Sequence, residues 1–281
     1  MAAFSAGSLL PVARAAAEPI SVAGAMSYAR SSNEFAAAIV LDAATGKELY
    51  SYQPDAVRSA ASLTKLMSSL VVLDTKPRWD RIVALTSADE VGGGRLRVTS
   101  GATMSIRDLW YSSIVASANN TVMTLARTSG LSSAKFATAM NKKAKDLGMT
   151  QSSFTEPSGM DPKNKVTARD MAILAQAAFN QADIRRAATT ASYAFNIRNQ
   201  KVAKTLTNTN TLLTEDPDVW VTGGKTGFLY ESQYNLAVRM RASSNPKDPA
   251  VLVIILGSPT KTGSFVSAKA LAQWAWKAYR W

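Results

Sequence analysis

The sequence predicts a mixed α/β (α+β) fold, in which both ends of the chain form an antiparallel sheet that helices cover. Near the start, two apolar or alternating runs joined by a turn predict a β-hairpin at residues 35–52. Further strand-like runs occupy residues 193–256, ahead of an amphipathic helix. Helical patterns dominate the chain between them and predict an inserted helical lobe at about residues 75–170. A functional site is expected in the cleft between sheet and lobe.

Helices are expected where apolar residues recur behind a capping residue. Ser105 with Asp108 three residues later fits a capping box, and Thr167 with Asp170 repeats the pattern. The largely apolar run at residues 63–73 is too long for a strand, so it predicts a buried helix. The predicted helices span residues 63–73, 105–115, 121–128, 132–147, 167–179 and 265–281.

Strands are expected in short apolar or alternating runs bounded by turn residues. The predicted strands span residues 35–41, 47–52, 193–197, 201–206, 219–225, 234–241 and 251–256. The last run is almost purely apolar and rich in β-branched residues, which is typical of a strand buried on both faces. We therefore expect residues 251–256 at the centre of the sheet.

The first 34 residues are expected to precede the folded domain. Residues 2–17 are small, apolar and free of acids, and the alanines at 15–17 fit the cleavage site of a secretory signal peptide. The basic start of such a peptide is missing, so a disordered tail is the alternative for residues 1–17. Residues 18–34 are expected to form a loose lead-in. No apolar run of about eighteen residues follows, so we expect no membrane-spanning helix.

Composition restricts the chemistry open to this chain of 281 residues. It has 32 Lys and Arg against 20 Asp and Glu, a net charge of +12, and neither Cys nor His. These absences exclude disulfides, thiolate nucleophiles, zinc–thiolate sites and the Ser-His-Asp triad. We expect no metal and no other cofactor, and a catalytic base that is a carboxylate, a Tyr or a Lys of lowered pKa. The positive charge suits an anionic polymer or membrane surface, but no nucleic-acid motif accompanies it.

Three short motifs fit an active-site serine hydrolase that works without His. They are S-x-x-K at residues 62–65, S-x-N at residues 117–119 and K-T-G at residues 225–227. The first begins a predicted helix, the second lies between two helices, and the third ends a predicted strand. Each motif alone is weak, but their order and their structural contexts agree with one another.

Ser62 is the candidate nucleophile and Lys65 its base. Residues three apart on a helix share a face, so the amine of Lys65 can reach the hydroxyl of Ser62. The helix N-terminus favours negative charge that develops near Ser62. Desolvation, or a second cation at Lys225, would lower the pKa of Lys65. The backbone N–H groups of Ser62 and Phe228 are expected to form the oxyanion hole.

The other motif residues are expected to move a proton and to bind substrate. Ser117 can shuttle a proton, and Asn119 can hold a substrate amide. Thr226 offers a hydroxyl to a substrate carboxylate. Gly227 has no side chain, so a substrate can approach the backbone of the strand closely.

A rival set in the same order starts at Ser132 and continues at Ser243 and Lys261. Ser132 has the context of an ordinary helix N-cap. Ser243 lies in a proline-rich turn, and Lys261 follows a proline past the end of its strand. We therefore favour the set that begins at Ser62.

The motifs and the segments around them resemble the low-molecular-mass penicillin-binding proteins, which are serine D-alanyl-D-alanine peptidases. The resemblance covers about residues 35–281 and includes "SAASLTKLMSSLVVLD", "MNKKAKDLGMTQSSFTEPSGM", "VTARDMAILA" and "NTNTLL" before "GGKTG". It implies the fold of DD-peptidases and β-lactamases, with a five-stranded antiparallel sheet, flanking helices and a helical lobe. It also implies one penicillin-binding domain over residues 35–281, without the C-terminal β-domain of some members.

The resemblance further implies a reaction and a location. Ser62 would attack the carbonyl of the penultimate D-alanine of a peptidoglycan stem peptide, forming an acyl-enzyme that water hydrolyses. β-Lactam antibiotics would acylate the same serine. This activity belongs to cell-wall biogenesis and cell shape, and places the protein in the periplasm or on the wall side of the membrane. We expect no nucleic-acid partner and at most peripheral membrane association.

Departures from the family pattern leave two activities open. Phe228 and Leu229 follow K-T-G where carboxypeptidases often have His and Thr, and Thr209 stands where some members have Arg. The segments Phe-Thr-Glu-Pro-Ser-Gly at residues 154–159 and Lys-Thr-Gly-Phe at residues 225–228 resemble the endopeptidase branch, which cuts D-alanyl–meso-diaminopimelyl crosslinks. A serine β-lactamase is the first alternative, although Glu156 does not lie in an E-x-x-L-N element. A non-catalytic wall-binding module is the second, and the intact motifs argue against it.

Overall fold

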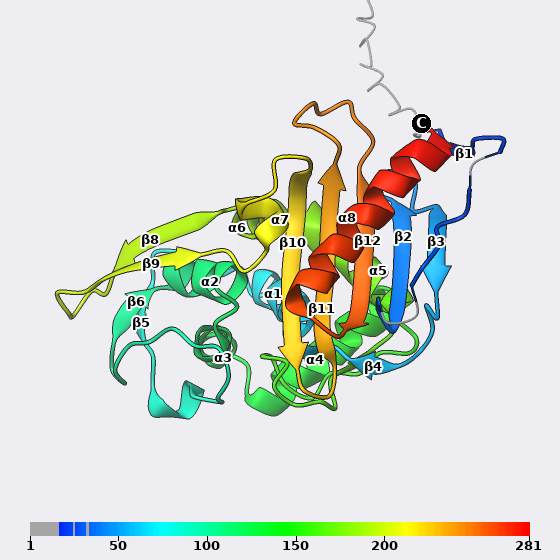
Figure 1. Ribbon diagram of the computed structural model, residues 1–281. Coiled ribbons are helices and arrows are strands. Elements are labelled where there is room, and N and C mark those ends of the chain that lie inside the picture. The colour runs from blue at the N-terminus through cyan, green and yellow to red at the C-terminus, as the bar shows by residue number, and fades with distance from the viewer. Residues whose placement is uncertain (1–16, 25, 32–33) are drawn as a thin grey trace, which may run out of the picture.

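The computed structural model describes residues 17–24, 26–31 and 34–281. At its centre a five-stranded antiparallel sheet has the strand order β10-β11-β12-β2-β3. Both chain ends supply its strands (Figure 1), which confirms the predicted fold class. These strands are β2 (Ala37–Asp42), β3 (Glu48–Tyr52), β10 (Trp220–Leu229), β11 (Gln233–Arg241) and β12 (Val251–Ser258). Residues 1–16 of the predicted signal peptide lie outside the described residues.

Helices cover both faces of the sheet. Helix α8 (Lys261–Ala278) lies on one face, while α1 (Thr64–Asp74) and α5 (Ala168–Asn180) lie on the other (Figure 1). On β12, Leu252 and Ile254 belong to the core cluster with α1 and α5, whereas Val253 belongs to the cluster with α8. Burial on both faces explains why residues 251–256 carry no polar alternation, and it confirms their central place.

The remaining elements lie around the sheet. The helices are α2 (Ile106–Val115), α3 (Asn119–Thr128), α4 (Ser133–Asp146), α6 (Ala182–Ala188), α7 (Thr211–Thr214), and the 3₁₀ turns η1 (Ala61–Leu63) and η2 (Ser87–Asp89). The paired short strands are β1 (Ile20–Ser21) with β13 (Tyr279–Arg280), β4 (Arg58–Ser59) with β7 (Lys165–Val166), β5 (Ile82–Ala84) with β6 (Thr103–Ser105), and β8 (Ser192–Asn196) with β9 (Ala203–Thr207). In the described part of the chain, no helix has the length and apolar character needed to cross a membrane.

Predicted capping residues set the helix starts. The backbone N–H of Asp108 donates to Ser105 Oγ at 3.1 Å, and the backbone N–H of Ser105 donates to the Asp108 carboxylate at 3.1 Å. Thr167 caps α5 through a 3.1 Å bond from the backbone N–H of Asp170. These contacts confirm the capping box at Ser105 and confirm Thr167 as the N-cap of α5, but the Asp170 carboxylate binds Gln151 and Ser152 instead of completing a second box.

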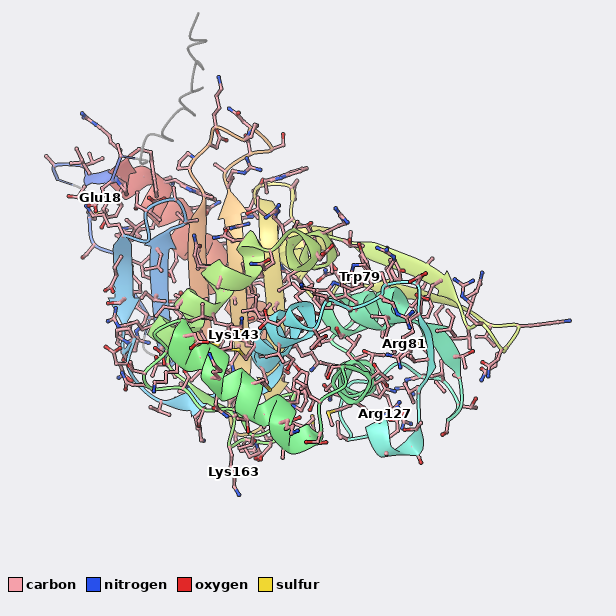
Figure 2. All side chains as sticks on the ribbon, turned by 180° about the vertical axis from the view of Figure 1, so that it is seen from behind. Glu18, Trp79, Arg81, Arg127, Lys143 and Lys163 are labelled. Atoms are coloured by element: carbon pink, nitrogen blue, oxygen red, sulfur yellow. The ribbon has the colours of Figure 1, made fainter. Side chains whose placement is uncertain are left out.

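Side-chain pairs join the helical elements to one another. Viewed from behind, α4 lies in front with Lys143 on it (Figure 2), and its amine forms a 2.7 Å ion pair with Asp74 at the end of α1. Arg127 of α3, also labelled there, binds the carboxylate of Asp89 with two nitrogens at 2.8 and 2.9 Å. The second pair connects α3 to η2 and thus to the loop that follows it.

Two predicted boundaries were wrong near the motifs. Strand β10 continues to Leu229, so Lys225 lies inside the strand rather than at its end. Helix α8 starts at Lys261, so this residue belongs to a first helical turn rather than to a loop. The glycines at 223, 224 and 227 weaken the β pattern in the sequence, but pairing with β11 supplies the missing stability.

Candidate active site

The three motifs meet beside the edge strand of the sheet. Ser62 lies in η1, directly before α1, and the S-x-N motif forms the junction between α2 and α3. The K-T-G motif lies on β10, whose outer edge faces that junction. The structure therefore brings together every motif residue that the sequence analysis selected.

The amine of Lys65 is held by three oxygen atoms. Its Nζ lies 2.8 Å from Ser62 Oγ, 2.6 Å from Asn119 Oδ1 and 2.7 Å from the backbone oxygen of Ser158. The residue is fully buried. The Asn119 and Ser158 oxygens can only accept hydrogen bonds, whereas the hydroxyl of Ser62 can also donate one. A neutral Lys65 would give its two hydrogens to those acceptors and direct its lone pair at Ser62.

Burial lowers the pKa of both lysines. It brings the pKa of Lys65 to about 7, against the opposing effect of the Glu156 carboxylate. The pKa of Lys225 is lowered well below its ordinary value, first by burial and then by the positive charge of Lys65. Of the two causes that we expect to lower the pKa of Lys65, desolvation is the larger in the structure.

The second lysine–serine pair lies next to the first. Lys225 Nζ donates to Ser117 Oγ at 2.7 Å and to the backbone oxygen of Thr226 at 2.8 Å. Ser117 has a positive φ of 57°, and Ala61, just before Ser62, has a φ of 48°. Non-glycine residues seldom occupy this region, and such strain is concentrated at functional sites.

Asn119 makes contacts that the sequence did not indicate. Its oxygen accepts from Lys65, and its Nδ2 donates to the backbone oxygen of Gly92 at 2.8 Å. The neighbouring Asn120 binds both the N–H and the carbonyl of Leu96, each at 2.9 Å. The loop at 90–96 is thereby attached to the S-x-N motif. Both ends of the Asn119 side chain thus have partners within the protein. That Asn119 holds a substrate amide stays a prediction.

The K-T-G strand approaches Ser62 at a glycine. A Cβ on Gly227 would lie 3.2 Å from the backbone nitrogen of Ser62. Thr226 Oγ1 lies 2.6 Å from Thr209 Oγ1, so two hydroxyls stand together at this edge of the sheet. Phe228 is partly exposed, at 41%, and its backbone directly follows Gly227. In the sequence Thr209 is only a departure from the family pattern, and nothing there indicates that it pairs with Thr226.

A loop behind Lys65 is the largest feature that the sequence analysis missed. The Glu156 carboxylate accepts from the backbone N–H groups of Ser158 and Gly159, both at 2.6 Å, and thereby fixes the loop that presents the Ser158 carbonyl to Lys65. Gly159 has a φ of 86°, and a Cβ there would lie 1.9 Å from the backbone oxygen of Ala61. The E-P-S-G sequence is a turn signal, but nothing in it indicates Lys65 as the partner.

The rival motif set is not assembled. Ser132 is the N-cap of α4 and accepts from the backbone N–H of Lys135 at 3.3 Å. Ser243 donates to the Asp248 carboxylate at 2.6 Å in the exposed turn between β11 and β12. Lys261 begins α8 on the opposite face of the sheet from α1. The three residues lie on separate elements, where Ser132 and Ser243 stabilise a helix start and a turn, so they form no common site.

A chain without His that pairs two serines with two buried lysines at S-x-x-K, S-x-N and K-T-G motifs has the machinery of the penicillin-recognising serine hydrolases. Comparison with known proteins narrows this class. The chain belongs to peptidase family S11, described as D-alanyl-D-alanine carboxypeptidase, which matches residues 25–260.

Individual relatives agree with this family. A D-alanyl-D-alanine endopeptidase of Pseudomonas aeruginosa is 33% identical over 240 residues, which are 84% of this chain and 76% of the relative. D-alanyl-D-alanine carboxypeptidase DacF of Bacillus subtilis is 27% identical over 254 residues, 88% of this chain and 63% of the relative. A mutant of the Streptomyces K15 DD-transpeptidase is similar in fold, with a TM-score of 0.80 at 23% identity over 88% of this chain and 100% of that one. The predicted serine DD-peptidase class is thereby confirmed.

Proposed function

We propose that Ser62 is the nucleophile through which this DD-peptidase hydrolyses D-alanyl bonds in peptidoglycan stem peptides. One observation carries the proposal: Lys65 is buried, has a pKa of about 7, and contacts Ser62 Oγ while two fixed acceptors hold the rest of its amine. A base with a pKa near the operating pH is the most effective in general base catalysis.

In the proposed reaction, neutral Lys65 takes the hydroxyl proton and Ser62 Oγ bonds to the carbonyl carbon of the substrate. The backbone N–H groups of Ser62 and Phe228 receive the negative charge on the carbonyl oxygen. Ser117 accepts a hydrogen bond from Lys225 and donates its hydroxyl proton to the leaving nitrogen as the C–N bond breaks. The proton that Lys65 took from Ser62 then passes to Ser117 and restores its hydroxyl. Water then hydrolyses the acyl-enzyme, with Lys65 again as the base.

The substrate would lie along the outer edge of β10. An edge strand can pair with an extended peptide through main-chain hydrogen bonds. The hydroxyls of Thr226 and Thr209 would bind the substrate carboxylate, and the carbonyl would lie beside Gly227, where the strand approaches Ser62. β-Lactams would enter in the same orientation and acylate Ser62.

Between the two activities, we favour the crosslink endopeptidase. The relative at 33% identity is named an endopeptidase, and the one at 27% is named a carboxypeptidase. A pair of hydroxyls at Thr209 and Thr226 supplies hydrogen bonds without the full charge of an Arg, so a terminal carboxylate would be held less strongly than in carboxypeptidases that have the Arg.

The β-lactamase alternative is weakened by the position of Glu156. Its carboxylate accepts from Ser158, Gly159 and Asn164, so it stabilises a loop and is not free to activate water.

The proposed location is the periplasm or the wall side of the membrane, where peptidoglycan is found. Any membrane association would be peripheral.

Digestion of purified muropeptides tests this function. The wild-type protein is incubated with crosslinked dimers and with uncrosslinked pentapeptides, beside Ser62→Ala and the control Ser132→Ala. We expect the wild type and the control to cut the dimers, and Ser62→Ala to leave both substrates intact. Cleavage of the pentapeptides alone would assign the carboxypeptidase activity instead, and cleavage by Ser62→Ala would refute the proposed nucleophile.

A further inference from the structure

A second site lies at the other end of the sheet. A pocket of about 1300 Å³ opens where β10 begins and β11 ends, and its lining includes Trp220, Arg239 and Arg241. Arg241 pairs with Trp220 across the two strands, whereas Gly227 pairs with Asn235. Arg241 is six positions after Asn235, which is about 20 Å along an antiparallel strand. This pocket is therefore separate from the site around Ser62.

Four arginines line this pocket, and one of them, Arg186, pairs with Asp183 at 3.7 Å. The other three converge without an acidic partner among the described residues. Arg239 and Arg241 are two residues apart on β11, so their side chains leave the same face of the sheet. Arg185 reaches the same region from α6 and also lines the pocket. The pKa of Arg239 is lowered to about 10, first by burial and then by the positive charges of Arg185 and Arg241. The three guanidinium groups therefore repel one another in a half-buried position.

No carboxylate compensates these charges within the described part of the chain, where none of the three arginines forms an ion pair. Three acids also line the pocket, but each has another partner. Asp42 accepts from the backbone of its own turn, Asp216 pairs with Lys269, and Asp248 accepts from Ser243.

The arginines bind only neutral groups. Arg239 donates to the backbone oxygens of Phe179 and Thr222 and to the side chain of Asn180. Arg185 donates to the backbone oxygen of Phe179 at 3.1 Å, and Arg241 donates to that of Asn245 at 3.0 Å. The Nε of Arg241 is buried and has no hydrogen-bond partner among the described residues. The positive charge of the three arginines is therefore met, in the part of the chain that the structure describes, only by neutral acceptors of the protein.

We propose that this pocket binds a phosphate-bearing ligand through Arg185 and Arg241, with Arg239 adding positive charge beneath it. Guanidinium groups match the oxygens of a phosphate and bind two of them at once. The volume exceeds what an inorganic ion needs, and Trp220, half exposed at the rim, offers a ring face to the group that the phosphate esterifies. The ligand is accordingly a phosphate ester, either a soluble one or an anionic lipid headgroup.

Isothermal titration of the full chain with sn-glycerol 3-phosphate at constant ionic strength tests the proposal, with acetate as the control anion. The variants are Arg241→Gln and Arg185→Gln. Arg239 is left unchanged because its guanidinium makes four hydrogen bonds, to Phe179 and Asn180 of α5 and to Thr222 of β10, so its replacement would disturb the fold. The matched control is Arg198→Gln, an exposed arginine on the β8–β9 hairpin. Melting temperatures verify that each variant is folded.

We expect saturable binding of glycerol phosphate to the wild type and to Arg198→Gln, at least tenfold weaker binding to each pocket variant, and no saturable binding of acetate. Penicillin acylation is expected to be the same in all four proteins, because the pocket is separate from Ser62. Cosedimentation with phosphatidylglycerol vesicles, but not with phosphatidylcholine vesicles, that is lost in Arg241→Gln would assign a lipid headgroup. Binding in solution without cosedimentation would assign a soluble ester. No saturable binding in either arm, or equal weakening in Arg198→Gln, would overturn the proposal.

Discussion

Lys65 places its amine 2.8 Å from the hydroxyl oxygen of Ser62, and it does so from a fully buried position. Two further acceptors, from Asn119 and Ser158, orient that amine. They come from the start of α3 and from the loop at 155–164, while Ser62 and Lys65 come from η1 and α1. The alignment of base and nucleophile therefore depends on three separate parts of the fold.

Replacing the proposed base will abolish most of the reactivity. In Lys65→Met an apolar side chain of similar length fills the buried position of the lysine. Methionine has no amine, so it cannot accept the proton of Ser62. General base catalysis contributes about 10²–10⁴-fold, so acylation by a fluorescent penicillin should slow by about that factor. Lys135→Met, at the lysine of the rival S-x-x-K, should acylate at the wild-type rate. An unchanged rate in Lys65→Met would show that another group is the base.

The pH profile of acylation will reveal the charge of Glu156. The neutral form of Lys65 is the base, so the wild-type rate should rise through about pH 7, where the pKa of Lys65 lies. The Glu156 carboxylate raises this pKa, because it stabilises the ammonium form. Glu156→Gln removes the charge at nearly constant size, so the midpoint should move to lower pH.

The control for that experiment is Asp161→Asn. It removes a charge from the same loop, but not the one that raises the pKa of Lys65. Stopped-flow acylation rates between pH 5 and 9 provide the measurement, with melting temperatures to verify folding. A midpoint for Glu156→Gln at or above the wild-type value would contradict the electrostatic account.

A methyl group at Gly159 will disturb the proposed nucleophile. In Gly159→Ala the new Cβ would lie 1.9 Å from the backbone oxygen of Ala61, next to Ser62, so the loop or η1 must move. Gly148→Ala is a matched control, because Gly148 also has a positive φ, 82°, but nothing within 4 Å of its Cβ position. Strain of this kind costs about 1–3 kcal/mol per residue, so both variants should melt at lower temperature. Only Gly159→Ala should lose acylation, and equal acylation in both would contradict this.

The hydroxyl pair at the edge of the sheet should act on substrate binding. Thr209→Val removes the partner of Thr226 Oγ1 while keeping the side-chain shape. One lost hydrogen bond to a charged group corresponds to about 1.5–3 kcal/mol, so KM for a peptide with a free carboxylate should rise at least about tenfold. We expect little change in kcat, and no effect of Thr207→Val, an exposed threonine on β9. Steady-state kinetics would contradict the role if kcat fell with KM unchanged.

Local patterns in the sequence predicted much of the fold. The capping box at Ser105 joins residues three apart, so the local sequence is sufficient to predict it. The run at 251–256 meets apolar surroundings on both faces, so its composition is sufficient to place it in the core. The contact between Ser62 and Lys65 was also predictable, because a spacing of three positions places both side chains on the same face of a helical turn.

Contacts between distant segments could not be predicted. Ser158 is 93 residues from Lys65, and its contribution is a backbone oxygen that any residue carries. The packing of Gly159 against Ala61 likewise depends on the whole fold. The end of β10 was misplaced for the same reason, because pairing with β11 rather than local propensity extends it to Leu229.

The central claim is that Ser62 forms the acyl-enzyme. Intact-mass spectrometry after incubation with benzylpenicillin tests it directly, on the wild type, on Ser62→Ala and on the control Ser132→Ala. The account predicts a persistent adduct of one benzylpenicillin on the wild type and on Ser132→Ala, and none on Ser62→Ala. An adduct on Ser62→Ala, or a wild type that forms no adduct and leaves the drug unchanged, would contradict it, whereas a wild type that consumes the drug without retaining an adduct would indicate a β-lactamase.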